Sequence, residues 1–186
     1  MFDIEQFVAD CRGALTEGQP ALAVKEVLDR ALARPADIDE ALGEPERGGI
    51  FTLHRSAEFT VLHVIWPPGV SLYPHEHRMF AANGIYGGRE DNTFYRRSAE
   101  GIVVSGGKQL DAGEAVLLGS DAIHSVVNPQ ASYTAAIHVY GGDYFATPRS
   151  QWDPGTLTEQ PFDVERLRQV LAEADEAARD HAGTEL

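Results

Sequence analysis

Residues 73–77, which read YPHEH, decide how this chain is interpreted, and residues 121–124, DAIH, carry a related pattern. On a β-strand successive side chains point to opposite faces, so residues two apart share a face. His75 and His77 therefore point the same way. Two imidazoles on one face can bind a metal ion at about 2.0–2.1 Å from each nitrogen, and the alternative is an ordinary polar pair. His124 stands in a similar strand-like setting and is the candidate for a third ligand.

The composition is that of an ordinary globular protein of 186 residues, long enough for one domain or for two small ones. Hydrophobic residues make up 43% of the chain and charged residues 24%. The 29 Asp and Glu residues outnumber the 15 Lys and Arg residues, which gives a formal charge of −14. Because phosphate groups are bound by clusters of Lys and Arg, this balance argues against nucleic acid and anionic membranes as partners.

Cysteine usage and the N-terminal residues bear on the compartment. Cys11 is the single cysteine, so an intrachain disulfide is excluded and a reducing compartment is expected. Its position on an apolar stripe predicts a small core residue. The first five residues, MFDIE, lack the basic and apolar regions of a secretion signal, and the chain has no long apolar run. We therefore expect a cytoplasmic protein, while the oligomeric state is left open.

The apolar spacing over residues 4–42 predicts helices. Pro20 suits the first turn of a second helix, since its fixed backbone angle is already helical. Asp37 begins a capping-box spacing before a short helix that ends at Gly43. Near the other end of the chain, Asp163 caps a further amphipathic helix.

From Gly49 the apolar period changes from helical to strand-like, with glycine-rich turns between short segments. The candidate strands are residues 50–55, 59–66, 70–77, 79–86, 92–97, 102–104, 115–118, 124–128 and 133–140. Many short strands without intervening helices indicate a sandwich or barrel. We expect one domain over residues 1–186, with a helical part at 1–48 packed on a barrel at 49–150 and an extension containing a helix at 151–186.

Glycines at fixed distances from the histidines resemble the motifs of a known family. The spacings are G-x5-H-x-H at residues 69–77 and G-x5-G-x-D-x2-H-x3-N at residues 113–128. They resemble the two motifs of the cupin family, and the second match is partial. The resemblance implies an all-β jelly-roll barrel, the double-stranded β-helix, with a metal at its centre. The glutamate that usually follows the second histidine is absent here, where Ala81 and Ala82 stand.

Without that glutamate, the predicted site consists of His75, His77 and His124 with open positions opposite. Three neutral ligands leave the charge of a dipositive ion uncompensated. Such a site favours anionic substrate ligands, thiolate above all. By ligand type alone, iron, nickel, copper, zinc and manganese are all compatible with it.

Three further side chains are candidates for the surroundings of the metal. Ala136, His138 and Tyr140 alternate along one strand and should face the barrel interior. His138 and Tyr140 form either a mutually satisfied core pair or a relay beside a metal-bound substrate. Arg55, at the end of the first candidate strand, is exposed by default, but a buried guanidinium beside a metal would bind a substrate carboxylate.

Four segments resemble the cysteine dioxygenase family within the cupins. Residues 59–77, ending WPPG and HEH, resemble its metal-binding hairpin, and residues 123–128, IHSVVN, resemble its third-ligand strand. Residues 137–140, IHVY, resemble its His-x-Tyr pair. Residues 85–95, IYGGREDNTFY, resemble a stretch of the bacterial members, which also have a helical N-terminus. The similarity covers most of the chain.

This resemblance implies a non-haem iron enzyme that uses O₂ to oxidise a small thiol to its sulfinic acid. The three histidines would bind Fe²⁺, with thiolate and O₂ in the open positions. Tyr140, oriented by His138, would hydrogen-bond the bound oxygen or the substrate. Arg55 matches the carboxylate-binding arginine of the family, which favours cysteine over 3-mercaptopropionate as the thiol.

Two mismatches and two alternatives accompany the resemblance. Animal members have a cysteine after the His-x-His that cross-links to the tyrosine, but residues 79–82 read MFAA, so Tyr140 can form no thioether. Ala136 stands where the relay of the family has a serine. The alternatives are a cupin that binds a metal and a small acid without redox turnover, and a cupin isomerase or dioxygenase for a non-thiol acid.

Overall fold

The computed structural model describes residues 1–184, with side chains described up to residue 180. The described helices are α1 Ile4–Ala14, α2 Pro20–Leu32, α3 Pro35–Leu42 and α4 Val164–Thr184. The described strands lie between α3 and α4 and are β1 Gly49–Arg55, β2 Thr60–Trp66, β3 Ser71–Glu76, β4 Ala81–Gly87, β5 Arg89–Ser98, β6 Gly101–Asp111, β7 Ala115–Leu118, β8 Ile123–Val127, β9 Thr134–Tyr140, β10 Ser150–Trp152 and β11 Glu159–Pro161.

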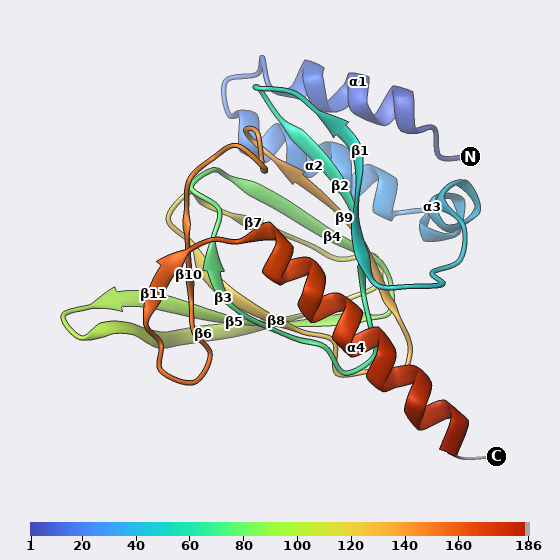
Figure 1. Ribbon diagram of the computed structural model, residues 1–186. Helices are drawn as coiled ribbons and strands as arrows, with labels where there is room; N and C mark the ends of the chain where they lie inside the picture. Colours follow the sequence, from blue (N-terminus) through green and yellow to red (C-terminus); the bar gives the residue numbers. More distant parts are fainter. Residues whose placement is uncertain (185–186) are drawn as a thin grey trace.

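The strands form two antiparallel sheets that enclose a common interior (Figure 1). One sheet has the order β1-β2-β9-β4-β7, and the other has the order β11-β10-β3-β8-β5-β6. Strands that are distant in the sequence pair in both sheets, as in β2 with β9 and β3 with β8. This topology is that of a jelly-roll barrel. The predicted fold class, a β-dominated double-stranded β-helix with N-terminal helices and a C-terminal helix, is confirmed.

Strand β2 contributes alternate side chains to two hydrophobic cores, one on each face of its sheet. Leu62 and Val64 point into the space between the sheets, whereas Val61 and Ile65 point toward the N-terminal helices. Every residue of β2 is buried, because the strand lies between the helices on one side and the barrel interior on the other. Burying one such side chain contributes about 1.5–3 kcal/mol to folding. The interior core is therefore closed off from solvent by a well-packed layer.

Helices α1, α2 and α3 cover the outer face of the five-stranded sheet (Figure 1). Helix α2 packs tightly against the sheet at Gly84 of β4. A Cβ at this position would lie 2.5 Å from a methyl of Leu32 and 3.0 Å from Leu28. Glycine allows this close packing, because a Cβ would displace the side chains of Leu32 and Leu28.

The helix ends agree with the sequence except at one position. Pro20 is the first residue of α2, and Gly43, with φ of 80°, ends α3. Helix α3 begins at Pro35 with Arg34 at the N-cap position, so the expectation that Asp37 caps it is wrong by three residues. Proline is favoured in the first helical turn, and Asp37 instead pairs with the N-terminal amine at 2.7 Å. Asp163 does cap α4, accepting a backbone N–H of its first turn at 2.9 Å.

The barrel uses more of the chain than the expected range of 49–150. Strands β10 and β11 extend the six-stranded sheet, and β10 pairs with β3 where Gln151 lies opposite His75. Both strands have three residues, which is too short for an alternating pattern to be recognised. Strand β6 is also longer than predicted, because its glycine-containing middle is exposed and lacks apolar alternation.

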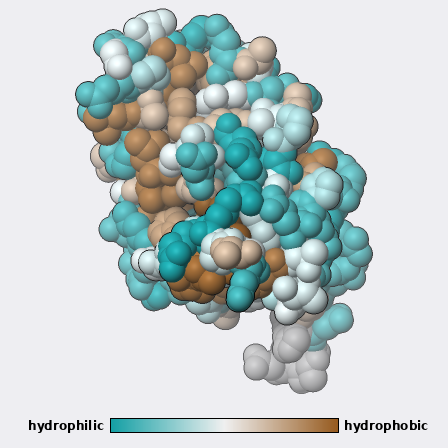
Figure 2. All heavy atoms as spheres, turned by 90° about the vertical axis from the view of Figure 1, so that its left-hand side faces the viewer, coloured by the Kyte–Doolittle hydropathy of each residue, from teal (hydrophilic) through white to brown (hydrophobic). Residues whose placement is uncertain are grey.

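The outer surface carries most of the polar residues. On the face at the left of Figure 1, hydrophilic side chains predominate, with hydrophobic ones gathered toward the upper left and the lower edge (Figure 2). Leu22 and Val104 are among the few large hydrophobic side chains exposed in the described part of the chain. Within residues 1–184, no helix has the length and apolar character needed to cross a membrane.

Three titratable side chains, His63, Tyr86 and Cys11, are buried in the core between the helices and the five-stranded sheet. His63 Nε2 lies 2.6 Å from the Tyr86 hydroxyl oxygen, so each polar group has a partner. Burial lowers the pKa of His63 to about 4. Cys11 has no exposed surface, and burial raises the pKa of its thiol to about 12, as fits the expected core residue.

We predict that His63 makes the free energy of unfolding fall on acidification. Between pH 6.5 and 4 the unfolded chain binds a proton at His63 that the folded chain does not, so stability is lost as the pH decreases through this window. His63→Gln removes this contribution, worth about 2–3 kcal/mol. Urea unfolding of metal-free protein at pH 7 and pH 4.5 measures it. Equal losses of stability for the wild type and the variant would contradict the prediction.

Candidate metal centre

The barrel interior brings the three predicted histidines together. His75 on β3 lies directly opposite His124 on β8, and His77 follows the end of β3. Their exposed fractions are 4%, 1% and 2%. One nitrogen from each ring lies within 4.8 Å of the others, a cluster that could hold a metal ion. Sequence spacing predicted all three rings, and the antiparallel pairing of β3 with β8 is what brings His124 to the other two.

A local irregularity helps to aim these side chains. The β3–β8 register shifts between Leu72 and His75, where Pro74 has no N–H to donate to the ladder. Bulges of this kind turn a strand and redirect the side chains that follow. Glu76 is turned away from the histidines, as expected. Its carboxylate is buried and accepts from Arg78 at 2.6 Å and Arg97 at 3.2 Å.

The hydrogen bonds of the rings leave the Nε2 atoms free for a metal. His75 Nδ1 lies 3.1 Å from the Tyr73 carbonyl oxygen, and His124 Nδ1 lies 2.8 Å from Asn92 Oδ1. Both acceptors require a proton on Nδ1, so both Nε2 atoms carry lone pairs. His77 Nε2 lies 3.0 Å from His124 Nε2, and His77 Nδ1 is buried without a partner. A shared cation satisfies this convergence of nitrogen atoms.

Burial keeps the three imidazoles neutral, which is the state that binds metals. It lowers the pKa of His75 to about 4. The pKa values of His77 and His124 lie well below the ordinary value, first because of burial and then because of the neighbouring histidines. No carboxylate joins the cluster among the described residues. Ala81 faces the interior core, and its methyl group can offer no ligand.

The cavity beside the histidines is small and mostly apolar. The space free for the centre of a water molecule is about 10 Å³, close to what one water needs. Its polar lining includes the three histidines together with Asn83, His138, Tyr140 and Tyr144. A small group bound there would be cut off from bulk solvent, which strengthens electrostatic interactions.

His138 and Tyr140 lie on the inner face of β9, as the alternation predicted. His138 Nδ1 is 3.0 Å from the Tyr140 hydroxyl oxygen. Burial lowers the pKa of His138 to about 3 and raises that of Tyr140 well above its usual range. The pair is therefore a neutral imidazole and a protonated phenol. The Tyr140 ring centroid lies 5.0 Å from that of His77, one of the three candidate metal ligands.

Arg55 does not lie where the family resemblance implied. Its guanidinium binds Asp143 through two hydrogen bonds of 2.9 and 3.0 Å, and 48% of its side chain is exposed. It stacks over Phe145, 4.9 Å from the ring centroid, and does not line the metal cavity. The expected role of Arg55 in binding a substrate carboxylate therefore lacks support from the geometry. Asp143 lies 88 residues away along the chain, so this pairing was invisible in the sequence.

Arg149 is the cation that sequence analysis missed. It lies in the segment before β10 and is 9% exposed. Its guanidinium carbon lies 4.2 Å from the ring centroid of Tyr144 and 3.8 Å from that of Phe162. Nη1 donates to the carbonyl oxygens of Tyr144 and Thr147, while Nε is buried without a partner. No carboxylate pairs with Arg149 among the described residues.

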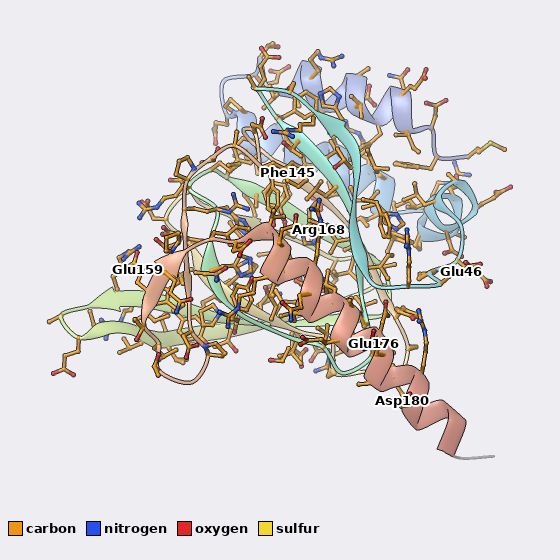
Figure 3. All side chains as sticks on the ribbon, in the orientation of Figure 1. Glu46, Phe145, Glu159, Arg168, Glu176 and Asp180 are labelled. Atoms are coloured by element: carbon orange, nitrogen blue, oxygen red, sulfur yellow. The ribbon has the colours of Figure 1, made fainter. Side chains whose placement is uncertain are left out.

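Arg149 lies at the mouth of the barrel. It lines a depression of about 270 Å³ together with Phe145, Phe162 and Tyr144. Tyr144 also lines the metal cavity, so the two spaces adjoin. Figure 3 shows Phe145 at the end of the barrel where α4 begins, near Arg168.

Asn83 is a second residue that sequence analysis missed. It has no exposed surface, lies opposite His138 in the β4–β9 register, and lines the cavity. Neither polar atom of its amide has a partner, and His138 Nε2 is also without one. A polar residue on the inward face between Ala81 and Ile85 was the available signal, since buried amides normally have partners.

Comparison with known proteins gives a likeness of fold. No family model matches the chain. Similar solved structures include a cupin family protein with a double-stranded β-helix fold from Methanocaldococcus jannaschii, with 12% identity over 55% of this chain and 86% of that one and a TM-score of 0.46. A DMSP lyase from Ruegeria pomeroyi has 17% identity over 59% of this chain and 54% of its own, with a TM-score of 0.47. A protein with a double-stranded β-helix domain from Klebsiella pneumoniae has 14% identity over 65% of this chain and 85% of its own, with a TM-score of 0.42.

We predict that each of the three histidines is needed for metal binding. His124→Ala should reduce the bound divalent ion from about one per chain to a small fraction of that, because two imidazoles remain where a stable site needs three protein ligands. His54→Ala is the matched control, since this ring packs on Phe59 and not on the cluster. Elemental analysis after loading with Zn²⁺ or Fe²⁺ and gel filtration measures the effect. Full occupancy in His124→Ala would contradict it.

Proposed function

We propose that the protein is an iron-dependent dioxygenase that converts a small carboxylated thiol into its sulfinic acid. The observation that carries the proposal is the combination, around one small cavity, of three buried neutral histidines and the His138–Tyr140 pair. The reaction R–S⁻ + O₂ → R–SO₂⁻ balances in atoms and charge. It forms two S–O bonds and breaks the O–O bond, with sulfur as the reductant and O₂ as the oxidant.

The ligand set supports an anionic substrate. Three neutral imidazoles contribute no charge to balance a dipositive ion, so a thiolate gains more here than at a site with a carboxylate ligand. Ferrous iron, which His75, His77 and His124 would hold, would supply the redox chemistry that joins a thiolate to O₂. The apolar walls of the cavity exclude water from this space. Exclusion of water protects a reacting sulfur from side reactions.

Tyr140 would hold a proton next to the reacting atoms. Its phenol stays protonated because burial disfavours the phenolate. If His138 donates from Nδ1 to the phenol oxygen, the Tyr140 proton is free to point into the cavity as a hydrogen-bond donor. A preorganised donor in a site without water stabilises developing negative charge on oxygen.

Arg149 would anchor the carboxylate of the substrate. Its buried guanidinium retains an unpaired Nε–H, pairs with no carboxylate among the described residues and stacks on Tyr144, which lines both the mouth and the metal cavity. A guanidinium binds a carboxylate through parallel hydrogen bonds. The preference for cysteine rested on Arg55, and Arg149 would serve cysteine and 3-mercaptopropionate alike. Both thiols are therefore substrates to test.

We expect iron-loaded protein to consume O₂ with L-cysteine or 3-mercaptopropionate and to form the sulfinate. Tyr140→Phe should lower kcat about 10²-fold while iron stays bound, because the variant loses a hydrogen-bond donor and no ligand. An oxygen electrode, product analysis by mass spectrometry and an iron assay on the same sample measure these quantities. Absence of O₂ uptake with any thiol at full iron occupancy would overturn the proposal and favour a metal-binding protein without redox turnover.

A second prediction separates the two arginines. Arg149→Gln should raise KM for the carboxylated thiol about 10–100-fold, since a charge-assisted hydrogen-bonded pair contributes about 1.5–3 kcal/mol. Arg55→Gln is the control and should leave KM within about 2-fold, because its guanidinium is occupied by Asp143 at the surface. Steady-state kinetics with both thiols measure the difference. A larger effect for Arg55→Gln would restore the role that the family resemblance implied.

A further inference from the structure

A buried carboxylate lies close behind the histidine cluster. Glu90 on β5 has no exposed surface. Its Oε2 accepts a hydrogen bond from the Trp66 indole nitrogen at 2.7 Å, and its Oε1 accepts one from the Asn92 side-chain nitrogen at 2.8 Å. No Lys or Arg among the described residues forms an ion pair with it. A carboxylate buried without a cation is costly, so its presence needs a reason.

Asn92 connects this carboxylate to the cluster. An ionised carboxylate only accepts hydrogen bonds, so Glu90 requires the amide nitrogen of Asn92 on its side. Asn92 Oδ1 then faces His124, whose Nδ1 lies 2.8 Å away. An acceptor at this position requires a proton on His124 Nδ1, which leaves the Nε2 lone pair directed at the other two rings. Two hydrogen bonds thus link the Glu90 carboxylate to the ring of His124.

The charge of Glu90 also complements the site. The three histidines are neutral, and no carboxylate belongs to their cluster in the described part of the chain. Glu90 lies in the same interior, and its charge is among the influences that raise the pKa of Tyr140, after burial and Tyr144. In a region of low dielectric constant, opposite charges attract over longer distances than in water.

We propose that Glu90 is a positioning residue of the metal centre. Acting through Asn92, it holds His124 in the tautomer with the proton on Nδ1 and supplies an outer negative charge for a divalent cation. This inference rests on the metal-binding part of the proposed function and does not depend on the thiol chemistry.

The substitution Glu90→Gln tests the role of the carboxylate with almost no change in volume. A glutamine can accept from Trp66 only if its amide nitrogen faces Asn92, and the Asn92 amide must then turn over. The Asn92 nitrogen would donate to His124 Nδ1, and the His124 proton would move to Nε2, where it blocks metal binding. We expect an affinity for Zn²⁺ or Co²⁺ about 10–100-fold lower than in the wild type.

Asp91→Asn is the matched control for the loss of one negative charge. Asp91 is the next residue of β5, is 38% exposed and pairs with Arg89 at 2.9 Å. The affinity of the Asp91→Asn variant for Zn²⁺ or Co²⁺ should stay within about 2-fold of the wild type, since solvent screens exposed charges. Competition with a chromophoric chelator gives the dissociation constants. Equal affinity in Glu90→Gln and wild type would overturn the inference alone, whereas absence of metal binding by the wild type would overturn the metal centre as well.

The double variant Glu90→Gln with Asn92→Asp distinguishes positioning from a general packing role. In it, the new amide can accept from Trp66 and donate to the new carboxylate, and that carboxylate can accept from His124 Nδ1. Every group is then satisfied, and the net charge is that of the wild type. Metal affinity should return to within about 5-fold of the wild type. Failure to recover, with the double variant folded by circular dichroism, would contradict the proposed chain of hydrogen bonds.

The tautomer of His124 can also be measured directly in the wild-type protein. Nitrogen-15 NMR of zinc-loaded protein should show His124 with a proton on Nδ1 that exchanges slowly with solvent, because it is buried in the bond to Asn92. A proton on Nε2 of His124 in the metal-free protein, or free exchange at Nδ1, would overturn the proposal even if Glu90→Gln did not fold.

Discussion

Antiparallel pairing between β3 and β8 sets His75 opposite His124, and the end of β3 brings His77 to the same point. Directly opposite residues in such a pair have Cβ atoms about 4.5–5.5 Å apart, close enough for two imidazoles to share one ion. The pairing is held by ladder hydrogen bonds and by burial between two sheets. The separation of the rings is therefore a property of the backbone, and the proposed chemistry depends on it.

Burial of these rings has two consequences that act together. It removes water, so the imidazoles are neutral and available as ligands. It also requires that each remaining ring nitrogen find a partner, which Tyr73 and Asn92 provide for two of the three rings. The tautomer of a ligand thus follows from where the surrounding acceptors lie. The rings that would bind the metal are therefore oriented by hydrogen bonds to Tyr73 and Asn92, which are not themselves candidate ligands.

The charged side chains near the cluster differ in sign between the barrel interior and its mouth. Glu90 is the acid behind the cluster, whereas Glu76 on the ligand strand is turned outward and neutralised by Arg78 and Arg97. At the mouth, Arg149 is a buried cation without an acidic partner in the described chain. A negative group behind the site and a positive group at its entrance favour a cation inside and an anion bound from outside.

The local patterns of the chain determined a great deal. Alternation identified nearly all the strands, proline and glycine marked helix ends, and the His-x-His spacing put two rings on one face. These features depend on neighbours in the sequence, and such patterns are visible there. The inward positions of His138 and Tyr140 follow from the same alternation.

Only the tertiary structure decided where the charged groups lie relative to the cavity. Arg55 has the residue type expected of a carboxylate anchor, but Asp143 binds it at the surface, while Arg149 occupies the mouth. Asn83 became significant because cross-strand register places it opposite His138. Asn92 and Glu90 became significant because a chain of hydrogen bonds links them to His124. Residue type and spacing describe one strand at a time. The partner of a long polar side chain depends on how strands from distant parts of the chain pack together. Strands as short as β10 and β11 show no recognisable alternation in the sequence.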